Sequence, residues 1–152
     1  MIRGRRSIRK YRDEPVARET VREILATTLY APTRTNQRIV RYTVVDDRAI
    51  LDQLADECFP GFDHNARIVK NAVGAVVVSV VTEATGVPPY AEGAAIKIAD
   101  WYMFDAGIAA QTFCLAAYEK GVGTVILGIF DEETIARLVH LPASETIVTV
   151  IP

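Results

Sequence analysis

The sequence predicts a single α+β domain in which about four strands form a sheet and helices pack against it. The length of 152 residues is that of one domain, and a chain of this size can bury roughly two-thirds of its unfolded surface. Helical and strand periodicities alternate along the chain without a repeat, a low-complexity run or a linker. One long stretch, residues 94–117, carries too few charges for a surface helix and therefore predicts a buried central helix.

The first half of the chain predicts helices and strands in alternation. A helix opens after Asp13-Glu14-Pro15 and ends at Ala31-Pro32, because proline favours helix starts and stops helices that precede it. Residues 33–36 form a polar loop and residues 41–45 a short strand. Asp46 or Asp47 caps the next helix.

A helix-ending turn, a short helical turn and a buried strand follow that helix. Residues 59–62, Phe-Pro-Gly-Phe, end the helix, and residues 67–71 form a single helical turn. Residues 73–81 are almost entirely apolar, which predicts a strand that is covered on both faces. A loop containing Gly86, Pro88 and Pro89 leads to the central helix.

The central helix is the element around which we expect the rest of the chain to pack. Residues 106–118 carry no charge, and this run is too short to cross a bilayer, which needs about 20 apolar residues. Its small residues allow other backbones to approach closely, so we expect one face to contact a second copy of the chain. Lys120 and Gly121 suit the C-terminus of the helix. A strand over 124–127, a helix capped by Asp131 and a strand over 146–151 complete the domain.

The charge distribution points to an anionic ligand. Six of the 17 cationic residues lie in the first twelve positions, with no acid among them. The remaining residues have 11 cations against 19 acids, a net charge of −8. A basic arm on an acidic body favours an anion at the arm and argues against a broad nucleic-acid surface.

Few residues suit acid–base, metal or nucleophilic chemistry. His64 and His140 do not have the spacing of metal ligands, and a nucleophilic pair of Cys58 with His64 is disfavoured. Cys58 and Cys114 fall in apolar helical patterns, which predicts buried free thiols in a reducing compartment, the cytoplasm. The glycines at 121, 123 and 128 follow a helix and open a strand, the reverse of a dinucleotide fingerprint. Asp100 and Asp105 are five positions apart, so we expect surface or helix-contact roles rather than a catalytic pair.

The strongest candidate site is Arg5-Arg6-Ser7-Ile8-Arg9. In an extended segment Arg5, Ser7 and Arg9 point to one side and place two guanidinium groups beside a hydroxyl, which suits a phosphate. The alternative is a solvated, mobile basic tail.

Three blocks of the sequence together resemble the FMN-dependent nitroreductase family. The first runs from Arg5 through Tyr11 to Ala31-Pro32-Thr33 and Asn36; the second covers 105–133, from Asp-Ala-Gly-Ile-Ala-Ala-Gln to Leu-Gly-Ile-Phe-Asp-Glu-Glu; the third is Leu141-Pro142 with the strand that follows it. The resemblance spans nearly the whole chain. It implies a nitroreductase-like fold, with a mostly antiparallel central sheet flanked by helices and a long central helix at a homodimer interface.

The resemblance also implies a role for each candidate residue. Arg5 and Ser7 would bind the FMN phosphate, with Arg6 supporting that site, and Arg9 would reach the pyrimidine end of the flavin. Asn36 would bind the polar edge of the ring. Leu127, Gly128 and Ile129 would place a backbone N–H near flavin N5. No metal is expected.

The chain departs from the family pattern at three places. Gln37-Arg38 stands where the family commonly has Gln-Pro-Trp, and Gln111-Thr112 where an asparagine is frequent. The sequence stops at Ile151-Pro152, so residues 1–152 are expected to be a single nitroreductase-like domain without the family's basic C-terminal arm, either as a short variant or as a truncated chain.

The expected function is that of an FMN-dependent oxidoreductase. The flavin would carry hydride from NAD(P)H to a nitro, quinone or similar electron-poor acceptor, so the protein needs no acid–base pair of its own. Two alternatives are a non-catalytic flavin- or nucleotide-binding dimer that has lost turnover, and a nucleic-acid-binding module that uses the arginine-rich arm. The acidic remainder argues against the last. The partners expected are therefore a second copy and a small molecule, with neither nucleic acid nor a membrane.

Overall fold

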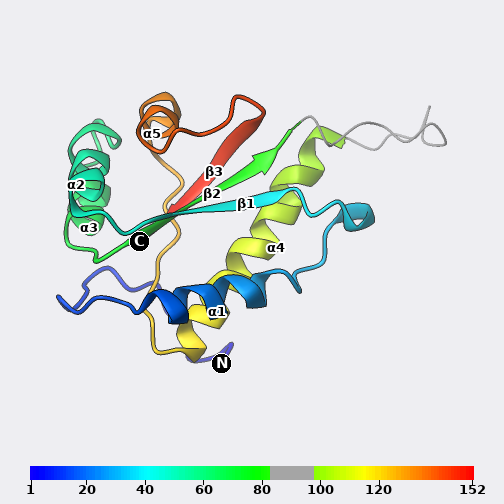
Figure 1. The fold of residues 1–152 in the computed structure, drawn as a ribbon, viewed down its shortest axis with the longest axis horizontal. Coiled ribbons are helices and arrows are strands. Elements are labelled where there is room, and N and C mark those ends of the chain that lie inside the picture. The colour runs from blue at the N-terminus through cyan, green and yellow to red at the C-terminus, as the bar shows by residue number, and fades with distance from the viewer. Residues whose placement is uncertain (83–97) are drawn as a thin grey trace.

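The computed structural model describes residues 1–82 and 98–152 and has an α+β fold (Figure 1). The elements, in chain order, are α1 (Arg18–Thr28), the 3₁₀ helix η1 (Arg34–Asn36), β1 (Val40–Val45), α2 (Arg48–Glu57), α3 (Asp63–Lys70), β2 (Ala75–Val81), α4 (Ile98–Glu119), α5 (Glu132–Leu138) and β3 (Glu145–Ile151). The predicted loop with Gly86, Pro88 and Pro89, and the start of the central helix at 94–97, lie outside the described residues.

The sheet of the described residues has three antiparallel strands in the order β1-β2-β3. β2 lies in the middle, and its run of valines is buried on both faces, as its sequence predicts. Val77 packs into one core cluster, while Val76 and Val78 pack into another, because successive side chains of a strand point to opposite faces. The sheet is therefore the middle layer of three.

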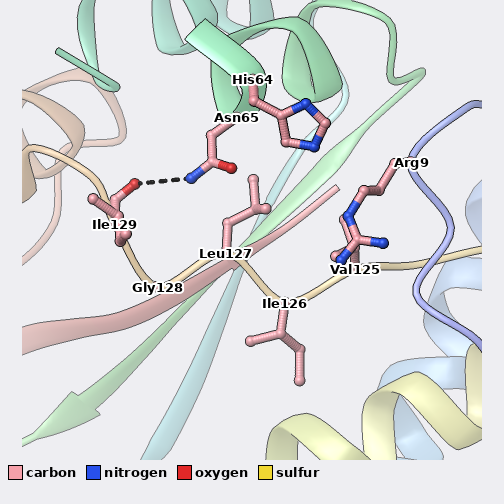
Figure 2. A pocket seen from close by; sticks show the side chains of 8 residues that line it. All are labelled: Arg9, His64, Asn65, Val125, Ile126, Leu127, Gly128 and Ile129. Carbon is pink, nitrogen blue, oxygen red and sulfur yellow. Dashed lines mark hydrogen bonds between the residues drawn. The ribbon is translucent and has the colours of Figure 1, made fainter. Parts of the chain in front are cut away.

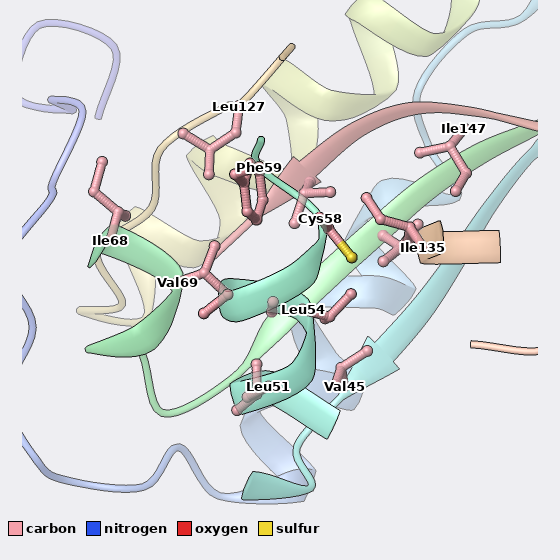
Figure 3. Packing of buried hydrophobic residues seen from close by; sticks show 14 of the residues in the cluster. Val45, Leu51, Leu54, Cys58, Phe59, Ile68, Val69, Leu127, Ile135 and Ile147 are labelled. Carbon is pink, nitrogen blue, oxygen red and sulfur yellow. The ribbon is translucent and has the colours of Figure 1, made fainter. Parts of the chain in front are cut away.

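Helices α2, α3 and α5 cover one face of the sheet, and α1 and α4 cover the other (Figure 1). The first face holds the larger core cluster, in which Leu51, Leu54 and Ile135 are at most 1% exposed (Figure 3). On the other face, Ala110, Phe113 and Ala117 of α4 are buried with Ile24 of α1.

The alanines of α4 between positions 106 and 117 are buried within the chain itself. This corrects the expectation that they face a second copy: Ala106, Ala109, Ala110, Ala116 and Ala117 are each at most 4% exposed. They allow α4 to approach α1 and the sheet closely. The open face of α4 instead carries Phe104, Gly107, Gln111 and Tyr118.

The helix caps confirm the local signals in the sequence. The carboxylate of Asp47 accepts hydrogen bonds from the backbone N–H groups of Ala49 and Ile50 at 2.8 and 3.2 Å, and that of Asp131 from Thr134 N–H at 3.2 Å. After α4 the N–H of Gly121 bonds to the carbonyl of Tyr118, and the N–H of Val122 to that of Ala117. This pattern is a Schellman cap, and Gly121 has the positive φ of 75° that it requires.

The structure corrects two of the predicted elements, one in its extent and one in its pairing with the sheet. The single turn expected at 67–71 is the end of α3, which begins at Asp63 because an acid suits the first turn and Gly61, with φ of 76°, reverses the chain before it. The fourth strand, expected at 124–127, is absent from the sheet of the described residues. This segment makes only two isolated bridges, one to Ser7 and one to Val150. Among the described helices, none has the length and apolar character needed to span a bilayer.

Candidate functional site

The basic N-terminal arm is docked on the domain, which argues against a mobile tail. Ser7 forms a parallel bridge with Thr124, and Ile8 N–H donates to Thr124 O at 2.9 Å. The Tyr11 hydroxyl lies 2.9 Å from Ile8 O and 3.1 Å from Pro152 O and shares its proton between them. Gly123 allows this close approach, because a Cβ at this position would meet the side chain of Ile8 at 3.0 Å. The arm is therefore fixed against the segment that follows α4.

The cationic side chains of the arm have different environments. The Arg6 guanidinium donates to the carbonyls of Arg3 and Arg5, both at 2.8 Å, and so stabilises the turn before Ser7. Arg5 is half-buried and lies near Cys114; burial raises the pKa of that thiol, and the Arg5 charge acts in the opposite direction. Ser7 and Arg9 are exposed.

Arg9 lines a hollow of about 510 Å³ together with residues 125–129 (Figure 2). The structure thus brings together four of the predicted site residues: Arg9, Leu127, Gly128 and Ile129. His64 and Asn65, from the first turn of α3, complete the lining, and Asn65 Nδ2 donates to Ile129 O at 3.4 Å. The sequence reasoning missed these two as site residues, although Asp63 is a signal for a helix start at this point.

The segment beside the hollow presents unused backbone donors. Leu127 exchanges both of its backbone hydrogen bonds with Val150, at 2.9 and 3.1 Å. In a paired extended segment the neighbouring residues direct their N–H groups to the other side, so those of Ile126 and Gly128 point away from β3. Within residues 1–82 and 98–152 these two N–H groups have no hydrogen-bond partner. A Cβ at Gly128 would meet nothing within 4 Å, so a flat ligand can approach this backbone.

Asn36 lies away from this group of residues. It is exposed in η1, and η1 is tied to α4 because Arg34 N–H donates to both carboxylate oxygens of Asp105, at 3.1 and 2.9 Å. Ser7 pairs beyond the other end of α4, at Thr124. A helix rises about 1.5 Å per residue, so the 16 positions from Asp105 to Gly121 span about 24 Å. One chain does not bring Asn36 and Ser7 to the same small ligand. Asp105 has the helix-contact role that the sequence suggested, and the side chain of Asp100 lies outside the described residues.

The arrangement is suited to binding rather than to acid–base or nucleophilic chemistry. Burial raises the pKa of the Cys58 thiol to about 12, with Glu57 and Asp131 adding to the effect, so Cys58 stays protonated. No group of three or more potential metal ligands occurs in the part of the chain that the structure describes. What the hollow offers is positive charge, an amide and open backbone N–H groups, which suit a planar ligand with several acceptor atoms.

Comparison with known proteins agrees with this geometry. Residues 2–152 match the model of the nitroreductase family. The chain belongs to this family. A relative from Methanothermobacter thermautotrophicus, named as a candidate NADH dehydrogenase/NAD(P)H nitroreductase, is 30% identical over 155 residues, covering 99% of this chain and 73% of its own.

Solved structures of the family share the fold. A nitroreductase family protein from Clostridium novyi superposes with a TM-score of 0.85 at 22% identity, covering 99% of this chain and 80% of its own. A candidate nitroreductase from Desulfovibrio desulfuricans, solved in complex with FMN, has a TM-score of 0.77 at 31% identity, again covering 99% and 80%. The nitroreductase fold of this chain is thereby confirmed.

Proposed function

We propose that this nitroreductase-family chain is an FMN-dependent oxidoreductase that uses NAD(P)H to reduce a nitro, quinone or similar electron-poor acceptor. The observation that carries the proposal is the open backbone edge at Ile126 and Gly128 beside the Arg9 guanidinium, in a hollow of about 510 Å³. This donor set fits FMN, because the isoalloxazine ring is flat, carries acceptor atoms and gains negative charge on reduction. The relatives described as NAD(P)H nitroreductases and the FMN complex of the Desulfovibrio protein support the same choice.

The residues of this chain have binding and orienting roles in the proposal. Arg5 and Ser7 hold the phosphate, and Arg6 fixes the turn that presents them. Arg9 supplies positive charge toward the pyrimidine end of the ring, where it favours the reduced, anionic form. The backbone around Gly128 offers an N–H to the ring edge, and Asn65 keeps that backbone in place through Ile129 O.

When bound, FMN supplies the hydride chemistry that no side chain here provides. Among the described residues that line the hollow there is no carboxylate and one histidine, His64, which makes no ion pair with a described carboxylate. The protein therefore contributes position, charge and shelter from water.

We also propose that the working unit is a homodimer. Asn36 and the Ser7 group lie at opposite ends of α4, so one FMN can contact both only if two copies of the chain contribute to its site. The open face of α4 supports this, because Phe104 and Tyr118 are 59% and 41% exposed. Exposed aromatic residues that recur along one helix are typical of an interface. The two buried free thiols favour a reducing compartment, and we place the enzyme in the cytoplasm.

The absorbance spectrum of the purified protein after addition of FMN tests the proposal. We expect a flavin band that stays with the protein on gel filtration, FMN as the cofactor released on denaturation, and a melting temperature that rises with FMN by mass action. Riboflavin, which lacks the phosphate, is the matched control and should shift the melting temperature less. Oxidation of NADH or NADPH on addition of a nitroaromatic or a quinone then separates an enzyme from a flavin-binding protein without turnover. No melting shift at saturating FMN in a folded protein would exclude the flavin site.

A further inference from the structure

The loop of residues 33–38, which carries η1, is held in a strained conformation. Thr35, Asn36 and Arg38 have positive φ angles of 50°, 57° and 50°. This left-handed backbone is unfavourable for residues other than glycine and persists only where the surroundings impose it. Here the constraints are the two hydrogen bonds from Arg34 N–H to Asp105 and one from Arg38 N–H to Thr33 Oγ1, at 3.1 Å.

The 33–38 loop and the start of β1 form a second basic segment. Arg34, Arg38 and Arg41 lie within eight positions, and no acid occurs between Leu29 and Val45. None of the three guanidinium groups makes an ion pair with a described residue. Arg41 donates to the carbonyls of Arg38 and Val40, and Arg38 Nε to Asn36 Oδ1 at 3.4 Å.

Arg34 is the residue of this segment whose guanidinium group has the least favourable environment. Its side chain is half-buried, yet its guanidinium group forms no hydrogen bond within residues 1–82 and 98–152. Its backbone N–H already engages the carboxylate of Asp105, which is only 2% exposed. Partial burial of an unpaired cation is costly, and the planar guanidinium fork matches the two oxygens of a carboxylate or phosphate.

An aromatic surface lies near the point where the 33–38 loop meets α4. Trp101 precedes Asp105 by four positions, so it lies on the same side of α4, one turn before the residue that anchors Arg34. Trp101 contacts Phe104 edge to face, with ring centroids 5.2 Å apart, and both rings are exposed. An unpaired guanidinium group and exposed rings on two contacting elements, the 33–38 loop and α4, together suit a ligand that is both aromatic and negatively charged.

We propose that Arg34 and Arg38 bind the carboxylate or phosphate of an aromatic substrate whose ring lies against Trp101. This inference rests on the proposed function and gives it a substrate class, namely anionic rather than neutral ring compounds. The same chemistry has two sources in such a reaction: an electron acceptor that carries a carboxylate, or the 2′-phosphate that distinguishes NADPH from NADH.

Titration calorimetry measures this preference without turnover. The probes are 4-nitrobenzoate and the neutral 4-nitrobenzyl alcohol, each titrated into the protein with and without saturating FMN. We expect the wild-type chain to bind 4-nitrobenzoate at least about tenfold more tightly, because a charge-assisted hydrogen bond is worth about one order of magnitude in affinity or more. Arg34→Gln and Arg38→Gln should each lose most of this difference and leave the affinity for the alcohol unchanged.

The variants are chosen so that the loop stays folded. Arg34→Gln keeps the backbone N–H that donates to Asp105, and Arg38→Gln keeps the backbone N–H that donates to Thr33 Oγ1. Arg34→Lys should retain part of the preference, because the charge remains while the planar fork is lost. Arg22→Gln removes the same charge from an exposed position on α1 and should change nothing.

A second titration, with NADPH and NADH, identifies the source of the anion. A loss of NADPH affinity in Arg34→Gln, with NADH unaffected, would assign the site to the 2′-phosphate. The proposal would be overturned if the wild type and Arg34→Gln each bound 4-nitrobenzoate no more tightly than 4-nitrobenzyl alcohol, and NADPH no more tightly than NADH. A failure of FMN binding would remove the proposed function alone, because the titrations without FMN still report the anion site.

Discussion

Both carboxylate oxygens of Asp105 accept hydrogen bonds from the one backbone N–H of Arg34, 71 positions earlier in the chain. The carboxylate is 2% exposed, and in the described part of the chain this N–H is its partner. A buried carboxylate with so few donors depends strongly on each of them. The contact joins the N-terminal half of α4 to the 33–38 loop and so fixes where Asn36, Arg34 and Arg38 lie.

We expect Asp105→Ala to lower the free energy of unfolding by about 1–3 kcal/mol, because it leaves Arg34 N–H buried without a partner. Asp105→Asn keeps one acceptor oxygen but brings an NH₂ group without an acceptor, so it should be destabilising as well. Urea denaturation measures the loss, and hydrogen exchange at Arg34 N–H should become faster in both variants. Asp13→Ala, which removes a carboxylate from an exposed position before α1, is the control. Unchanged exchange at Arg34 in Asp105→Ala would show that the loop does not depend on this contact.

Arg5→Ala and Ser7→Ala should each weaken FMN binding at least about tenfold, because a hydrogen bond to a charged group contributes about 1.5–3 kcal/mol. Fluorescence titration with FMN measures this loss. The same variants should bind riboflavin as the wild type does, since riboflavin has no phosphate. Arg22→Ala controls for the loss of one positive charge. Equal losses for FMN and riboflavin would contradict a phosphate role and indicate a general disturbance of the arm.

Local sequence signals predicted the parts of the fold that depend on neighbouring residues. Helix starts at Asp47 and Asp131, and the helix end at Gly121, depend on contacts within a few positions. The run of valines in β2 likewise predicts that the strand is buried. These features are readable because their physical cause lies within the same segment. The resemblance to the nitroreductase family extended the prediction from single elements to the whole fold.

Features that depend on contacts between distant parts of the chain could not be predicted from local sequence signals. The periodicity of 124–127 indicates an extended chain but not its partner, and this segment pairs with Ser7 on one side and Val150 on the other. The grouping of His64 and Asn65 with Arg9 also depends on how α3 packs. The separation of Asn36 from Ser7 along α4 follows from the Arg34–Asp105 contact, for which neither segment carries a local signal.

Gly107 offers a direct test of the dimer. It is exposed on the open face of α4, and a Cβ there would meet nothing within 4 Å in the same chain. Gly107→Ala should therefore stabilise the isolated chain by about 1 kcal/mol through helix propensity. Gly107→Arg is equally compatible with the helix but places a long charged side chain on the proposed interface, so it should shift the protein to monomer. Light scattering after gel filtration measures the mass, and circular dichroism verifies the fold. A Gly107→Arg protein with the same mass as the wild type would place the interface elsewhere.

The last prediction concerns alkaline pH. Burial raises the pKa of Cys58 to about 12, with Glu57 and Asp131 adding to the effect, and burial also raises the pKa of Cys114. In the unfolded chain a thiol ionises near pH 8.5. Between that pH and 12 the unfolded state therefore loses a proton that the folded state keeps, so the free energy of unfolding should fall as pH rises through this range.

Urea midpoints at pH 7, 9 and 10.5 measure this loss of stability. Cys58→Ala should be less stable at every pH because of the cavity, but its midpoint should fall less steeply above pH 9. Alkylation by iodoacetamide at pH 8 gives an independent check, because the thiolate is the reactive form. Both cysteines should react slowly in the folded protein and rapidly in urea. Rapid labelling of Cys58 in the native state would show that its thiol is neither buried nor held protonated. It would also indicate that the core beneath α2 and α3 is accessible to the reagent.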